Sequence, residues 1–397
     1  MAEAYYELML KYRMNCELLP FSGAGGPDRY VELLRKYYRH YGFSTYKLPT
    51  EYKEDSYDGE AIDFDAEAFI EYIVAIARAS MEDKIDYLDK ALVYFTFSSG
   101  IDEPQTKENY EKCRRFSKVY GALLRDIDAR LKTEFSSRPD YSYYRKTIAP
   151  TLLKMPMMLT LCHVRHYWEI QDYDVGNFTY CPVAHALAFP RLRRSIREQS
   201  DTCWWYTCTG PVYPYPSTHI DDYAVSMRLI GWMQKAYRLQ GYLNWAAAIN
   251  ARLEYPYENP DIGFSNGDGW VLYAGRYYGI YGPVPSLRAV AFRDGMQDYC
   301  YLDMAEKNSD ESEKAIIGRF YDELFDNTRV LVTDASLLDS FRDELAKAIA
   351  GGKMEFEERD EWILLDDCTS AETTIIRSNS KYEPRIETGT DGEYSAK

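Results

Sequence analysis

The chain has 397 residues, of which 46% are apolar and 15% aromatic, so it is long enough for one large globular core or two ordinary ones. Its formal net charge is −16 and it has no basic stripe, which argues against nucleic acid or an anionic membrane surface as a partner. No apolar run is long enough to span a bilayer, so membrane insertion is not expected.

The eight cysteines show no paired CxxC spacing, and scattered cysteines of this kind are typical of buried thiols in a reducing compartment. The first residues, Met1 to Tyr6, lack the basic stretch and apolar core of a secretory signal. The chain as written is therefore expected to be cytoplasmic, although a fragment of a secreted protein would look the same. Composition says nothing of the oligomeric state.

Helices are expected, in chain order, over residues 3–13, 28–40, 65–80, 82–89, 107–134, 184–199 and 222–240. Strands are expected over residues 14–20, 43–48, 91–97, 157–163, 178–182, 202–207 and 241–246. Alternation of strand and helix predicts a parallel sheet, and this many units favour a closed (β/α)8 (TIM) barrel over an open doubly wound sheet. Because the chain opens on a helix, we expect the first strand of the barrel to be missing.

Amphipathic patterns predict further helices over residues 283–307 and 334–350, and a Gly-Gly pair follows the second. Residues 353–397 are rich in acidic and polar side chains. We therefore predict a barrel domain over residues 1–307, C-terminal helices packed on it over 308–352, and an acidic, largely disordered tail over 353–397.

The adjacent acids Asp102 and Glu103 stand where an apolar run gives way to a polar loop, and Pro104 is expected to hold Glu103 extended. A partly buried pair of carboxyl groups favours one protonated and one charged member, which suits proton donation to a leaving group. The same residues are also a common signal for the start of a helix, since acids complement the helix dipole.

Geometry restricts the chemistry of such a pair. Ordinary glycosidases set two carboxyl groups on opposite sides of the scissile bond. Neighbouring residues at one strand end approach a sugar from the same side. They therefore suit a mechanism in which one acid handles the proton and the other steers a nucleophile that belongs to the substrate.

Aromatic residues end two later strand candidates. Trp204, Trp205 and Tyr206 follow one another, and alternation along a strand places Trp204 and Tyr206 on one face. The segment 241–245 ends in Asn244 and Trp245. Aromatic rings at barrel strand ends are good floors for the C–H faces of sugars, while Trp205 is expected to pack in the core.

A series of motifs occurs in one order along the second half of the chain: Trp204-Trp-Tyr, Arg228-x-x-Gly-Trp232, Gly241-Tyr-Leu-Asn-Trp245, Gly267-Asp-Gly269, Leu272-Tyr-Ala-Gly275, Ser286-Leu-Arg288 and Arg293-Asp-Gly-Met-Gln-Asp-Tyr299. This order resembles the carboxyl-terminal portion of glycoside hydrolase family 123 and of its related catalytic-like domain family. The likeness is dense over residues 201–302, and the Asp102-Glu103-Pro104 segment matches the family's catalytic pair.

The resemblance implies a β-N-acetylgalactosaminidase or related β-N-acetylhexosaminidase that retains configuration with help from the substrate. Glu103 would protonate the glycosidic oxygen, and Asp102 would orient the 2-acetamido group. Tyr206 would bond the acetamido oxygen and Trp245 would floor the sugar pocket, while Trp204 and Asn244 would complete it. The implied partner is a carbohydrate substrate, and no metal or organic cofactor is implied.

Other signals are weaker. His163 follows a strand candidate and is expected to line the cleft rather than bind a metal. Arg288 and Asp298 lie at helical spacing with other charged residues and are expected to form buried ion pairs. Two rival functions stay open: a catalytically inactive carbohydrate-binding barrel, and a glycosidase for sugars that lack the acetamido group.

Overall fold

The computed structural model of the chain describes residues 1–16, 19–20, 25–50, 66–94, 102–162, 178–191, 193–194, 202–248, 266–356, 386–388 and 394–396. Its first half contains helices α1 (Ala2–Lys11), α2 (Gly26–Tyr37), α3 (Ala66–Asp83), η1 (Tyr87–Lys90), α4 (Lys107–Phe135), α5 (Tyr141–Tyr143), η2 (Tyr144–Ile148), α6 (Ala149–Lys154) and η4 (Ala184–Ala188), with strands β1 (Tyr46–Lys47), β2 (Ala91–Leu92), β3 (Met157–Leu161) and β4 (Phe178–Pro182).

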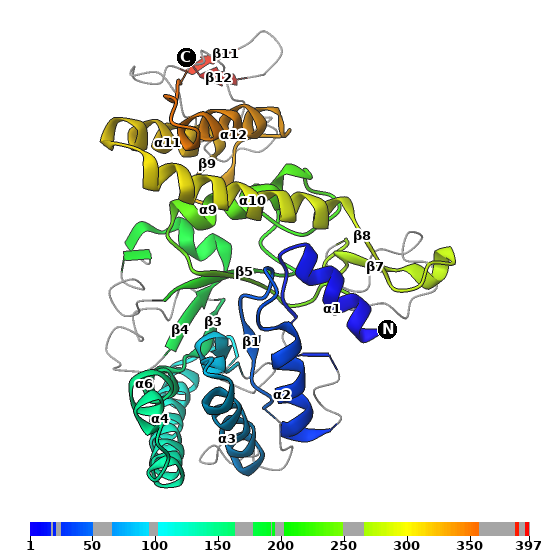
Figure 1. The fold of residues 1–397 in the computed structure, drawn as a ribbon. Coiled ribbons are helices and arrows are strands. Elements are labelled where there is room, and N and C mark those ends of the chain that lie inside the picture. Colours follow the sequence, from blue (N-terminus) through cyan, green and yellow to red (C-terminus); the bar gives the residue numbers. More distant parts are fainter. Residues whose placement is uncertain are drawn as a thin grey trace.

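The second half contains strands β5 (Trp204–Thr207), β6 (Gly241–Asn244), β7 (Leu272–Ala274), β8 (Pro283–Pro285), β9 (Phe325–Asp326), β10 (Arg329–Val330), β11 (Ile386–Thr388) and β12 (Tyr394–Ala396). Its helices are α9 (Val225–Ala236), η5 (Gly275–Tyr278), α10 (Leu287–Asn308), α11 (Glu311–Leu324) and α12 (Ser336–Ile349). Figure 1 shows the central strands between two groups of helices: α2, α3, α4 and α6 on one side, and α9 to α12 on the other.

Strands β1 to β6 lie side by side in chain order and run parallel. The pairs β1–β2, β3–β4 and β5–β6 are parallel. Isolated parallel bridges from Val93 to Met157 and from Tyr180 to Cys203 join one pair to the next. Every residue of β3 and β4 is buried, as expected for parallel strands that are covered on both faces.

The pairing changes after β6, where Ala248 forms an antiparallel bridge to Trp270 and β7 pairs antiparallel with β8. The protein is thus an α/β domain whose parallel strands follow one another in sequence order. Among the described strands the sheets are two-stranded, and their pairings do not close into the predicted barrel. The parallel series begins at β1, after two helices.

One predicted strand is not found among the described residues, and one predicted helix begins later than expected. The described residues between 14 and 20 form no strand, and the Asn15 side chain instead donates to the carbonyl of Gly42 at 3.0 Å. The helix predicted from Pro283 begins at Leu287, because Pro283–Pro285 pairs with β7 and the Ser286 hydroxyl caps the helix. Periodicity alone does not reveal a short strand that depends on its partner.

Helices α9 and α10 pack backbone to backbone at two glycines. A Cβ atom on Gly231 would lie 2.0 Å from the carbonyl oxygen of Gly295, and one on Gly295 would lie 2.2 Å from that of Arg228. Only glycine permits this approach. The requirement explains two glycines in the ordered motifs and fixes α10 across α9 (Figure 1).

A buried charge network closes the same crossing. Asp298 on α10 is fully buried and accepts from Arg228 Nε at 2.6 Å and from the Trp232 indole nitrogen at 2.9 Å. Arg342 on α12 lies 3.3 Å from the same carboxylate. The ion pair expected at Asp298 is therefore present, and its cationic partners come from α9 and α12.

Replacing Asp298 with alanine is expected to lower the free energy of unfolding by about 3 kcal/mol, because it leaves the buried Arg228 guanidinium with only the exposed Asp339 as a carboxylate partner. Equilibrium denaturation in urea measures the change. The control is Lys314→Ala, which breaks an exposed pair with Glu311 and should cost less than about 1 kcal/mol. Equal losses in the two variants would contradict the role assigned to Asp298.

The C-terminal helices share the core of the strands. Phe320 of α11 stacks on Phe341 of α12 with ring centroids 4.2 Å apart, and Met354 is buried in the same hydrophobic core. Within the predicted tail the structure describes residues 353–356 and the antiparallel pair β11–β12, and the rest lies outside the described residues. None of the helices described is long and apolar enough to cross a membrane.

Candidate active site

The acid pair lies at the carboxyl ends of two neighbouring strands. Asp102 Oδ1 accepts from the hydroxyl of Tyr94, which follows β2, at 2.9 Å, and from Thr160 Oγ1 on β3 at 2.7 Å. The Glu103 backbone N–H donates to the same Thr160 hydroxyl at 3.0 Å. One threonine thus fixes the positions of both acids, each of which is half-buried.

Glu103 does not have the extended backbone that Pro104 predicted. Its φ is +50°, in the left-handed region that side chains other than glycine rarely adopt. Such a conformation costs on the order of 1–3 kcal/mol and persists where neighbours enforce it. The bond to Thr160 and the start of α4, where Thr106 and Asn109 form a capping box, hold the segment from both sides.

Tyr206 meets the acid pair from β5. Its hydroxyl donates to Glu103 Oε1, and the side chain is buried. Burial raises the pKa of Tyr206 far above its usual value, and the negative charge of Glu103 adds to the effect. The hydroxyl therefore keeps its proton and acts as a donor. The Glu103 carboxylate and the Tyr206 phenol thus meet although they lie 103 residues apart in the sequence.

Trp204 and Trp205 of the same strand pack elsewhere. Trp205 is fully buried and meets Tyr242 edge to face at 5.6 Å, as expected for a core residue. The Trp204 ring lies over Gly241, where an added Cβ would be 2.3 Å from the indole. Trp204 thus sits at the amino ends of β5 and β6, whereas Tyr206 points to Glu103 nearer the carboxyl end.

Asn244 and Trp245 end β6. Asn244 pairs in register with Thr207, so β6 ends beside the strand that carries Tyr206. The Asn244 side chain accepts from the Ala246 backbone at 3.3 Å. Trp245 is half-buried, and its indole nitrogen donates to Asp268 at 2.9 Å. His163, predicted to line the cleft, lies outside the described residues.

Sequence reasoning missed two neighbours of the acid pair, Thr160 and Cys162. Thr160 carries the one hydroxyl group in the otherwise apolar strand Met157–Leu161. A single polar residue in such a strand is a signal that could have pointed to the site. Cys162 follows β3, and burial raises the pKa of its thiol to about 12, with the charge of Glu103 as the next cause. The thiol is therefore protonated at neutral pH and does not compete with the carboxyl groups as a nucleophile.

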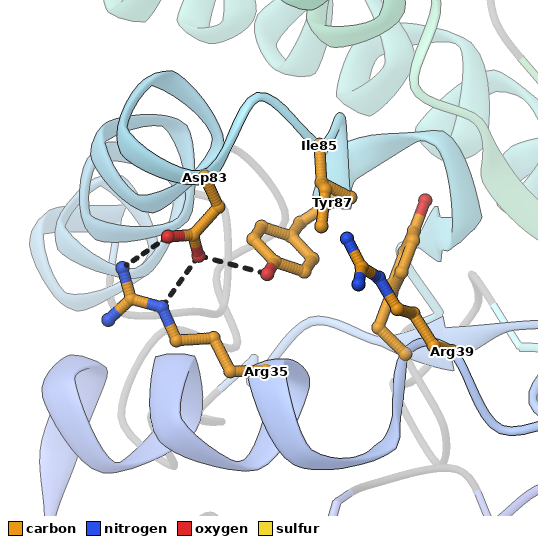
Figure 2. A pocket seen from close by; sticks show the side chains of 6 residues that line it. Arg35, Arg39, Asp83, Ile85 and Tyr87 are labelled. Carbon is orange, nitrogen blue, oxygen red and sulfur yellow. Dashed lines mark hydrogen bonds and ion pairs between the residues drawn. The ribbon is translucent and has the colours of Figure 1, made fainter.

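A surface pocket of about 320 Å³ lies away from the acid pair and is lined by Arg35, Tyr38, Arg39, Asp83, Ile85 and Tyr87. Figure 2 shows Asp83 between Arg35 and the Tyr87 hydroxyl, which it accepts from at 2.7 and 2.9 Å. Arg35, Tyr38 and Arg39 precede β1, and the other three residues precede β2. The acid pair instead follows β2. The pocket belongs to the helix ends at the other edge of the strands.

Among the described residues, no group of three or more His, Cys, Asp and Glu side chains is arranged to hold a metal ion. The described side chains around the acid pair are instead hydrogen-bond donors: two hydroxyl groups on Asp102 and one phenol on Glu103. An acid pair with fixed donors can move a proton and stabilise charge.

Comparison with known proteins assigns the chain to a family. The family model for the catalytic domain of glycoside hydrolase 123 matches residues 52–305, well over half of the chain. The chain belongs to this family, as its ordered motifs predicted. The match includes the acid pair, Tyr206 and Trp245.

The chain is also similar to a family 123 glycoside hydrolase from Clostridium perfringens, whose structure was solved to describe glycolipid glycan hydrolysis. The two share 13% identity with a TM-score of 0.45, over 82% of this chain. The chain spans 54% of the length of that protein. No curated protein matches the chain.

Proposed function

We propose that this protein hydrolyses terminal 2-acetamido-2-deoxy-β-hexosides, with N-acetylgalactosamine preferred, and retains the configuration at the anomeric carbon. The observation that carries the proposal is the shared anchor of the acid pair: Thr160 holds both Asp102 and Glu103, so the two carboxyl groups approach a ligand from one side. The preference for the galacto configuration rests on the resemblance alone.

In the proposed reaction, Glu103 gives its proton to the glycosidic oxygen as the bond from that oxygen to the anomeric carbon breaks. The acetamido oxygen of the substrate attacks the anomeric carbon from the opposite face and forms an oxazolinium ion. Asp102 orients the acetamido group and stabilises its positive charge. Water then attacks the anomeric carbon and gives a proton to Glu103. The oxazolinium ring opens, and the sugar is released as the β-anomer.

Tyr206 has one proton to donate, so it cannot serve Glu103 and the acetamido oxygen at the same time. We propose that it holds Glu103 before the sugar binds and passes to the acetamido oxygen in the complex. Trp245 provides the floor of the sugar site at the end of the next strand. We assign Trp204 to packing rather than to the sugar site, because its ring lies over Gly241.

We also infer that β1 to β6 form part of a (β/α)8 barrel, with the site at the carboxyl ends of the strands. The chain-order parallel pairing supports this inference. In such a barrel, the acid pair, Tyr206 and Trp245 belong to the same rim.

Three chromogenic substrates test the proposal: a β-N-acetylgalactosaminide, a β-N-acetylglucosaminide and a β-galactoside with the same leaving group. Cleavage of the acetamido sugars without the plain galactoside is expected, because only they carry the internal nucleophile. Sugar binding without turnover would favour an inactive carbohydrate-binding barrel. Cleavage of the galactoside alone would favour a glycosidase for sugars without the acetamido group.

Tyr206→Phe is expected to lower kcat/KM for the N-acetylgalactosaminide by about 10- to 100-fold, since a hydrogen bond to a charged group contributes roughly 1.5–3 kcal/mol. The matched control is Tyr242→Phe on the neighbouring strand, which removes a buried hydroxyl bonded to Thr207. That control should change kcat/KM less than about threefold. Similar losses in both variants would point to folding rather than to a contact of Tyr206 in the sugar site.

A further inference from the structure

Asp268 is a buried carboxylate behind the proposed sugar site. Only 1% of the residue is exposed, and it lies in the turn between β6 and β7. Its Oδ2 accepts from the Trp245 indole nitrogen at 2.9 Å, and its Oδ1 accepts from Thr218 Oγ1 at 3.4 Å. Burying a carboxylate is costly unless its oxygens are bonded, and here the bonds lead to two separate segments.

The turn that carries Asp268 is fixed on both sides by Arg288. This buried side chain in the first turn of α10 donates to the carbonyl oxygens of Thr218 and, at 2.7 Å, of Gly267. Its other terminal nitrogen donates to the carbonyl of Trp270 at 2.5 Å. Arg288 was expected to form a buried ion pair, and the partners described are instead three backbone carbonyls and the Tyr273 hydroxyl.

Two glycines complete the turn around Asp268. Gly267 and Gly269 have φ values of +75° and +73°, a conformation that favours glycine. A Cβ atom on Gly267 would also lie 2.8 Å from the Arg288 guanidinium. The carboxylate is thus placed by a turn that has little freedom to shift.

The Thr218 bond links this turn to the loop that follows Tyr206. That loop begins at Cys208, directly after β5. Its far end is held near its start by the His219 ring, whose Nε2 lies 3.0 Å from the Cys208 carbonyl oxygen. Asp268 therefore connects Trp245 to the loop that starts beside the acid pair. An indole that packs under a sugar needs a fixed orientation, because a misplaced indole loses contact with the sugar.

We propose that Asp268 is a positioning residue that fixes the plane of the Trp245 indole for sugar binding. The inference rests on the proposed function, in which Trp245 floors the sugar site. Asp268 itself does not touch the substrate.

The test compares Asp268→Ala with Asp268→Asn, whose amide oxygen still accepts from the indole. Asp268→Ala is expected to raise KM for the N-acetylgalactosaminide about 10-fold with kcat changed less than about threefold, because binding energy is lost equally in ground and transition states. Asp268→Asn should keep KM within about threefold of the wild type. A merely structural role would lower the melting temperature without separating KM from kcat.

Acrylamide quenching of Trp245 fluorescence, taken as the difference between each protein and its Trp245→Phe counterpart, gives a readout that needs no turnover. Quenching of Trp245 should increase in Asp268→Ala and stay unchanged in Asp268→Asn. In the Trp245→Phe background, Asp268→Ala should raise KM no further. If the alanine variant does not fold, Asp268→Ser decides, since its hydroxyl is too short to reach the indole.

Unchanged quenching in the alanine or serine variant would overturn the proposal. So would an equal rise in KM with and without Trp245. If the wild type cleaves no acetamido sugar, the proposed function fails, while the quenching experiment still decides whether Asp268 fixes Trp245. The two failures are therefore distinguishable.

Discussion

Glu103→Gln is expected to lower kcat for a β-N-acetylgalactosaminide by about 10²- to 10⁴-fold, the usual contribution of a general acid. The amide has the shape of the carboxyl group but cannot give a proton to the glycosidic oxygen. Its oxygen still accepts the Tyr206 hydroxyl, so the site should keep its geometry. Initial rates with a chromogenic substrate measure the loss.

The leaving group provides the control for this variant. A dinitrophenolate departs without protonation, so the first step of Glu103→Gln should be far less impaired with that aglycone than with an alkyl one. Equal loss with both aglycones would place Glu103 outside the proton transfer. The melting temperature should stay close to that of the wild type, because the substitution adds and removes no volume.

Asp102→Asn is expected to lower kcat for the same substrate by about 10²- to 10³-fold, the range found when one preorganised electrostatic partner of a transition state is removed. Tyr94 and Thr160 both donate to Oδ1, and an amide oxygen in that place accepts them equally well. The variant therefore removes the negative charge of the Asp102 side chain and keeps the side chain in place. It isolates the stabilisation of the oxazolinium ion.

The control for Asp102→Asn is Glu311→Gln, which neutralises a carboxylate on the exposed start of α11. That change should leave kcat unaltered. A second readout is the affinity for a thiazoline analogue of the bicyclic intermediate, which should fall together with kcat/KM in Asp102→Asn. Full activity in Asp102→Asn would contradict the role given to this acid.

Local sequence predicted the parallel strands well, because β3 and β4 are short runs buried on both faces and β5 is nearly so. β4 has the bounds that its apolar run predicted, and β3, β5 and β6 begin within the predicted ranges. The failure at Pro283–Pro285 has the opposite cause. Proline weakens any strand prediction, and only pairing with β7 makes this segment a strand.

The acid pair could be recognised because its two members are adjacent in sequence. The resemblance also pointed to Tyr206, but the bonds that Thr160 and Tyr206 make to the acids could not be predicted, since they depend on the register of strands far apart along the chain. The backbone of Glu103 was predicted wrongly because the rule for residues before proline is local, and the bond to Thr160 is not. The position of the Trp204 ring also depends on a residue distant in sequence, since the ring lies over Gly241 on the next strand.

Proton NMR of the first product formed from a β-N-acetylgalactosaminide tests the central claim most directly. Two acids on one side of the sugar leave the substrate's own acetamido oxygen as the nucleophile, so two displacements should return the β-anomer before mutarotation. Initial release of the α-anomer would contradict this account of how Asp102 and Glu103 work together.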